Sequence, residues 1–318
     1  MSTLRKLSFC MLVALFLLVV PTIFAQETFG LSDEDFALLS AAPAVTFASD
    51  SFAFEFTANF SVGGMGSEET SASISGSGVF GGSEDNPLFQ LILNGEAILE
   101  GETQPLSGEI RIVGNTLYWS GFDNGAGWQG QTLESLASEF GDLAGMMGGG
   151  DLPVDPESLA SGDLSGLAGM EGMSEAMAAL ASLDPSEFIT MTRDDANGLA
   201  HFTVDLSISD LLSSPAVISM MGMAGGMEGM EMSEQEMQSM AMGMAMLFAD
   251  ASATFEEYVD PATSLLQRAV LDINVPLSAM TGDASAGIAL NFDISLSGFG
   301  EPVTVEAPEG ATMVPAGN

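Results

Sequence analysis

Hydrophobic and polar residues alternate strictly between residues 52 and 62. Every second position there is apolar, and the residues between them are mostly small or polar. A period of two places one set of side chains on one face of a β-strand. The alternation therefore predicts a half-buried strand whose inner face carries Phe52, Phe54, Phe56 and Phe60.

Similar strand patterns recur on both sides of a less regular middle section. They cover approximately residues 70–80, 88–99, 104–113, 116–121, 188–193, 199–208, 253–258 and 265–275. A last alternation places Ile288, Leu290 and Phe292 on one side of a strand. The connections within each series are short, which favours antiparallel neighbours because parallel strands need long crossovers.

Helical patterns lie before and between these strands. Ser32 precedes three acidic residues, which is typical of a capped helix N-terminus. A later stretch restarts at Ser233, and spacings of three and four residues form an apolar stripe of Met237, Met240, Met244 and Leu247. We predict one α+β domain over residues 26–318, with Gly- and Met-rich insertions near 144–172 and 220–246.

The first 25 residues have the order of a secretory signal. Arg5 and Lys6 precede an apolar run from Leu7 to Val20, and Ala25 offers a small residue for cleavage. The run is about 14 residues long, whereas a membrane-spanning helix needs roughly 20. We predict cleavage after Ala25 and export to the periplasm or the extracellular space; retention of the segment as an anchor is the alternative.

Charge and cysteine content narrow the class of partner. The chain has 44 acidic and 5 basic residues, a net charge of −39, and Cys10 within the signal is its single cysteine. A chain of this charge repels nucleic acid. We predict no nucleic-acid partner, and a core that forms without disulfides.

Candidate catalytic chemistry is sparse. His201 is the single histidine, so neither a histidine-based triad nor a transition-metal site is favoured. We predict a protein that is not an enzyme and uses no cofactor. Closely spaced thioethers suit Cu(I), which leaves copper handling by Met237, Met240, Met242, Met244 and Met246 as an alternative.

Several segments resemble a known superfamily. They are Arg111–Trp119, Ala200–Leu206, Glu257–Thr263 and Phe299–Val303. Together with the Phe-rich first strand they are similar to the periplasmic lipoprotein carriers typified by LolA and the mycobacterial LppX and LprG lipoproteins, over residues 45–312. The resemblance implies a strongly curved antiparallel sheet, a half-barrel, whose concave face is covered by helices over a cavity for acyl chains. The acylated cysteine of LppX-type members is missing.

These observations predict an exported, non-catalytic carrier or binding protein for a lipid or another apolar small molecule, with transient contact with a membrane. The predicted cavity is lined by Phe52, Phe54, Phe56, Phe60, Met237, Met240, Met244, Leu247, Ile288, Leu290 and Phe292. The second reading is a structural or sensory interaction module of the same fold with a filled core, and the third is a Met-rich copper-handling protein. The oligomeric state is left open.

Overall fold

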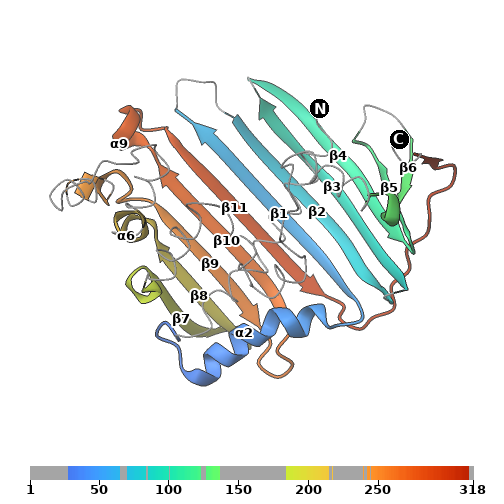
Figure 1. The fold of residues 1–318 in the computed structure, drawn as a ribbon, viewed down its shortest axis with the longest axis horizontal. Helices are drawn as coiled ribbons and strands as arrows, with labels where there is room; N and C mark the ends of the chain where they lie inside the picture. Colours follow the sequence, from blue (N-terminus) through green and yellow to red (C-terminus); the bar gives the residue numbers. More distant parts are fainter. Residues whose placement is uncertain are drawn as a thin grey trace, which may run out of the picture.

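All the strands that the computed structural model describes belong to one broad sheet (Figure 1). The structure describes residues 28–64, 70–83, 85–99, 101–122, 127–136, 184–214 and 245–314, together with residues 217, 239, 242 and 243. The predicted signal, the predicted insertion near 144–172 and most of the insertion near 220–246 lie outside these residues, and so do Met237, Met240 and Met244. The strand order is β12-β6-β5-β4-β3-β2-β1-β11-β10-β9-β8-β7.

The first half of the sheet is an antiparallel meander. Its strands are β1 (Phe52–Gly63), β2 (Thr70–Ser83), β3 (Asn86–Leu99), β4 (Glu102–Val113), β5 (Thr116–Ser120) and β6 (Gln129–Thr132). The second half contains β7 (Ile189–Ala196), β8 (Leu199–Ser207), β9 (Ser252–Val259), β10 (Leu266–Pro276) and β11 (Gly287–Ser297). A short strand, β12 (Thr312–Met313), runs parallel to β6.

Pairing of β1 with β11 joins the two halves. Phe56 lies opposite Ile294, and Phe60 lies opposite Leu290, along an antiparallel register that runs the length of both strands. Because side chains alternate between faces, this register puts the apolar residues of both strands on one face and the polar residues on the other.

Helix α2 (Asp33–Phe47) lies across one end of the sheet (Figure 1). Ser32 caps it as predicted, because its hydroxyl accepts a hydrogen bond from the backbone N–H of Asp35 at 3.2 Å. At the other end of the helix, Thr46 is fully buried and its Oγ1 accepts a hydrogen bond from the N–H of Leu266 at 2.8 Å. The hydrogen bond of Thr46 joins α2 to β10, and the helix packs against β9 and β10.

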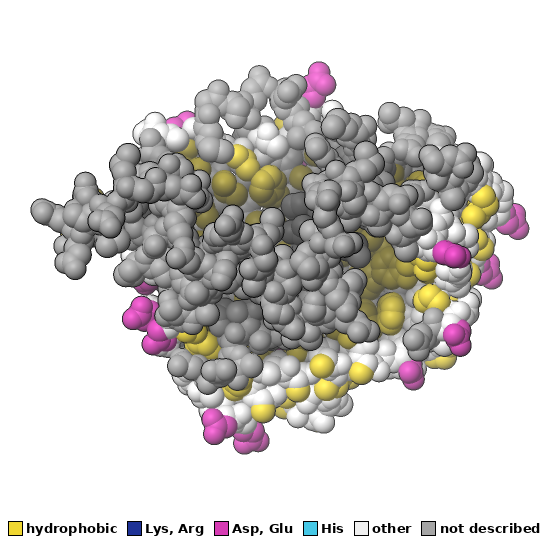
Figure 2. All heavy atoms as spheres, viewed as in Figure 1, with side chains coloured by type: hydrophobic (Ala, Val, Ile, Leu, Met, Phe, Trp, Pro, Cys, Tyr) yellow, Lys and Arg dark blue, Asp and Glu magenta, His cyan; other side chains and the backbone are white. Residues whose placement is uncertain are grey.

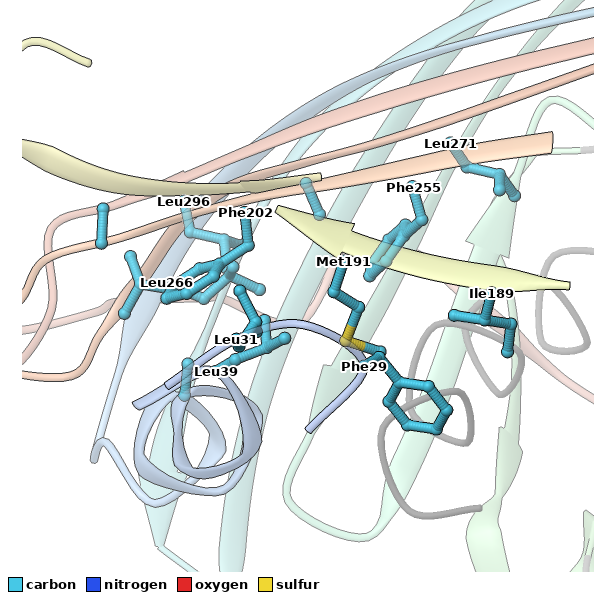
Figure 3. Packing of buried hydrophobic residues seen from close by; sticks show 14 of the residues in the cluster. Phe29, Leu31, Leu39, Ile189, Met191, Phe202, Phe255, Leu266, Leu271 and Leu296 are labelled. Carbon is cyan, nitrogen blue, oxygen red and sulfur yellow. The ribbon is translucent and has the colours of Figure 1, made fainter. Parts of the chain in front are cut away.

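The hydrophobic core lies between α2 and the second half of the sheet (Figure 3). Leu39 of the helix packs in the same cluster as Phe202 and Phe255 of the sheet. The segment before the helix covers the edge strand, since the N–H of Met191 donates to the carbonyl of Phe29 at 3.0 Å. The predicted α+β class, a large antiparallel sheet with helical cover on one face, is confirmed.

The sequence patterns do not predict five short elements of the structure. They are strands β6 and β12 and the helices η2 (Pro185–Glu187), α6 (Ile208–Ser213) and α9 (Ser278–Thr281). The parallel pairing of β12 with β6 departs from an all-antiparallel sheet. The strands predicted over residues 188–193 and 199–208 pair as a hairpin, and Asn197 and Gly198 in its turn have positive φ, 56° and 83°.

Candidate functional site

One face of the sheet is apolar across most of its strands. On β3 and β4 it carries Leu91, Leu93 and Ile110, and Trp119 of β5 lies opposite Ile110. Helix α2 packs over β9 and β10, whereas the face of β1 to β5 carries large side chains that are mainly half-buried. Figure 2 shows patches of hydrophobic side chains on this face, inside a rim that carries acidic side chains.

The structure brings the predicted sheet residues of the cavity together on this face. Phe52 and Phe292 are buried, and the others on β1 and β11 are half-buried: Phe54, Phe56, Phe60, Ile288 and Leu290. Leu247 is also half-buried, in a helical turn. Their role as ligand contacts stays a prediction, because the described residues do not show an enclosed cavity on this side.

Next to β1, glycines of β2 leave space on the apolar face for neighbouring side chains. Gly76 and Gly78 of β2 lie directly opposite Phe56 and Phe54. A Cβ atom at Gly76 would lie 2.4 Å from Cε1 of Phe56, and one at Gly78 would lie 2.5 Å from Cζ of Phe54. The two phenyl rings therefore lie over the glycine backbone instead of standing out from the sheet, which makes a flat aromatic surface.

Ring contacts extend this surface in both directions. Phe54 stacks with Phe89 of β3 at 6.0 Å between ring centroids, and Phe56 stacks with Phe292 of β11 at 5.7 Å. Offset aromatic pairs of this kind add to the stability of a hydrophobic surface. The flat surface thus spans the central strands of the sheet.

The opposite face is polar. Two depressions that the described residues line, of about 420 and 390 Å³, lie mainly on this side. Short side chains form their floor, among them Ser71, Ser73 and Ser75, and Ser73 Oγ donates to Asn59 Oδ1 at 2.8 Å. Of the residues predicted to line the cavity, Phe60 and Leu290 contribute to the lining of the first depression and Phe56 to that of the second.

His201 also lies on the polar face. Its ring stacks on Tyr258 at 4.3 Å, Nδ1 lies 2.7 Å from Asp194 Oδ1, and Nε2 lies 3.2 Å from Glu256 Oε2. The guanidinium of Arg268, on the neighbouring strand β10, also lies over the Tyr258 ring, 5.3 Å from its centroid. Within the described part of the chain, no three His, Cys, Asp or Glu side chains are arranged to hold a metal ion.

Glu257 is the one acidic side chain buried on the apolar face among the described residues. It lies between Phe202 of β8 and Ala269 of β10, and it is 2% exposed. Its Oε2 has no hydrogen-bond partner in the described structure, and burial raises its pKa to about 8. At neutral pH the group is therefore an uncharged carboxylic acid in the core.

Sequence reasoning missed Glu257, although the signal was present. Ala253, Phe255, Glu257 and Val259 alternate with polar residues along β9, so the register places Glu257 in an apolar row. Arg193 of β7 lies in the same row as Glu257, directly opposite Phe202. Its guanidinium contacts the Phe202 ring and forms ion pairs with Asp35 of α2 and with Asp195. The pKa of Asp35 is lowered by a hydrogen bond from the Ser32 hydroxyl and, to a smaller extent, by a hydrogen bond from Arg193.

Comparison with known proteins gives only distant similarity. No known family model matches the chain, and no curated protein sequence matches it. Among solved structures, LprF from Mycobacterium bovis is 17% identical over 88% of this chain and 99% of its own, with a TM-score of 0.33. Lipovitellin, described in terms of lipid–protein interactions, is 8% identical over 82% of this chain and 26% of its own, with a TM-score of 0.28. At such TM-scores these matches support no functional conclusion.

A membrane-spanning helix is not found in the described part of the chain, where no helix is long and apolar enough. The predicted signal segment lies outside that part, so export and cleavage after Ala25 stay predictions.

Proposed function

We propose that the protein is a non-catalytic carrier or binding protein that holds a lipid or another apolar small molecule against the apolar face of its sheet, and that it works outside the cytoplasm. The observation that carries this proposal is the flat aromatic surface over Gly76 and Gly78. A large residue at either position would occupy the space over which the phenyl rings of Phe56 and Phe54 lie, and the flat surface would be lost. Glycine there costs strand stability, and it leaves a broad, low surface on which a hydrocarbon chain can lie.

The energetics of this surface suit an acyl chain. Burying apolar area contributes about 0.8 kcal/mol per CH₂ group, so a chain that contacts the surface over several methylenes binds without any specific polar contact. The half-buried side chains of Leu91 and Leu93, next to the stacked rings, extend the same contact.

A pair of adjacent residues on β3 tests the proposal. Leu93 lies on the apolar face, whereas Ile92 is 40% exposed on the polar face. We expect Leu93→Asn to weaken the binding of a fluorescent fatty acid by about tenfold, which corresponds to roughly 1.4 kcal/mol. The matched variant Ile92→Asn should bind as the unmodified protein does.

Fluorescence titration of the two variants and the parent gives the three affinities under the same conditions. Equal weakening by both variants would mean that binding does not involve the apolar face. A parent protein that takes up no fatty acid would contradict the proposed function itself.

A further inference from the structure

Large aromatic side chains are exposed where α2 ends and the sheet begins. Phe47 at the C-terminal end of α2 is 51% exposed, and Phe80 near the end of β2 is 37% exposed. Both contact the buried ring of Phe52, at centroid distances of 6.0 and 5.3 Å, and Phe299 contacts it at 6.3 Å. We call Phe47, Phe52, Phe80 and Phe299 the aromatic tip.

The aromatic tip is continuous with the flat aromatic surface. Phe52 contacts Phe54 at 6.5 Å, and Phe54 stacks with Phe89 at 6.0 Å. Phenyl rings therefore follow one another from the exposed Phe47 and Phe80 into the apolar face. An apolar molecule that enters at the tip meets aromatic carbon along this path.

The two ends of α2 differ in polarity. Its first turn is acidic, Asp33 to Asp35, whereas Val45 and Phe47 near its other end are 37% and 51% exposed. A helix that is acidic at one end and exposes apolar side chains at the other can place the apolar end in a bilayer interface and keep the charged end in water. The apolar end is the one that adjoins Phe52.

The negative charge of the chain determines which kind of membrane the aromatic tip can bind. The chain carries a net charge of −39, and Asp50 is exposed next to the tip. The described arginines have their ring contacts elsewhere, with Trp128, Phe202 and Tyr258. Anionic headgroups and a second copy of this polyanion are both repelled, whereas zwitterionic headgroups are not.

We propose that the aromatic tip docks on lipid bilayers with zwitterionic headgroups and is the place where the apolar ligand passes between membrane and protein. The docking stands on the exposed rings and the charge; the passage of ligand rests on the function proposed above. Phe47 and Phe80 enter the interfacial layer of the bilayer, and Phe52 connects them to the apolar face.

Vesicle flotation of the full chain tests the docking. The vesicles are pure phosphatidylcholine in one series and contain 30% phosphatidylglycerol in another, a composition chosen so that charge is the main difference. We expect binding to phosphatidylcholine that falls when phosphatidylglycerol is added. The double variant Phe47→Ser/Phe80→Ser should bind phosphatidylcholine about tenfold more weakly, given the apolar area it removes. Ile92→Ser, which removes an exposed apolar side chain on the polar face, should bind as the parent does.

Flotation that the double variant leaves unchanged, or a preference for the anionic vesicles, would overturn the docking. A parent that sediments as a dimer and a double variant that sediments as a monomer would also overturn it, because the tip would then be an interface between copies. Titration of a fluorescent fatty acid without vesicles separates this test from the proposed function. We expect the double variant to retain that affinity and to lose only the rate of uptake from vesicles, whereas failure of the proposed function would appear as no fatty-acid binding in any variant.

Discussion

Replacing Glu257 by glutamine is expected to stabilise the protein, and increasingly so as the pH rises. The carboxyl group is 2% exposed between Phe202 and Ala269, and its Oε2 has no described partner. Burial raises its pKa from the ordinary value of 4.5 to about 8. Glutamine has a similar shape and stays uncharged at every pH.

The direction of this pH dependence follows from proton binding to Glu257 in the folded and unfolded states. Between pH 4.5 and about 8 the folded chain holds a proton on Glu257 that the unfolded chain has released. Raising the pH through this interval therefore favours the unfolded state. At about 1.4 kcal/mol per pH unit, the whole interval corresponds to roughly 5 kcal/mol, a large part of the 5–15 kcal/mol that usually separates folded and unfolded domains.

Urea unfolding at pH 5, 6.5, 8 and 9, at constant ionic strength, measures this effect. The advantage of Glu257→Gln over the parent in unfolding free energy should grow by several kcal/mol from pH 5 to pH 8 and then level off. Glu55→Gln, at an exposed position on the polar face of β1, supplies the baseline for removing one acidic group. If the difference in unfolding free energy between variant and parent changes with pH in the same way for Glu257→Gln as for Glu55→Gln, the assignment of Glu257 as a neutral buried acid is wrong.

Two further substitutions probe the flat aromatic surface and the attachment of α2. Gly76→Ala should cost about 1–3 kcal/mol of unfolding free energy by displacing the Phe56 ring, whereas Gly127→Ala, with no atom within 4 Å of the new methyl group, should cost little; equal losses in urea unfolding would argue against the flat ring arrangement. Thr46→Val should cost about 1–3 kcal/mol, because it leaves the first N–H of β10 without its acceptor. Its control is Thr57→Val on the exposed polar face, and thermal unfolding that ranks the two variants equally would contradict the buried hydrogen bond.

Local features of the fold could be predicted because each has a local cause. The alternation from Phe52 sets the inner face of β1, and the hydroxyl of Ser32 begins α2. The hairpin at Asn197 and Gly198 follows from the positive φ that these residues tolerate. Each of these signals lies within a few residues of the structure that it produces.

Long-range relations had no such signal. Alternation shows which residues share a face but does not show which strands are neighbours, so the pairing of β1 with β11 came only from the structure. The short parallel pair of Thr312 with Gln129 has too few residues to show a period. Alternation predicts which side chains of β1 and of β11 share a face, but the glycines that flatten this face matter only because Phe56 lies opposite Gly76 in the next strand.

Native mass spectrometry of freshly purified protein, followed by organic extraction, tests the central claim most directly. The account predicts protein ions with additional mass that is lost on extraction, and a lipid or other apolar molecule of that mass in the organic phase. Protein ions at the mass of the polypeptide alone, together with no uptake of a fluorescent fatty acid by the same sample, would contradict it.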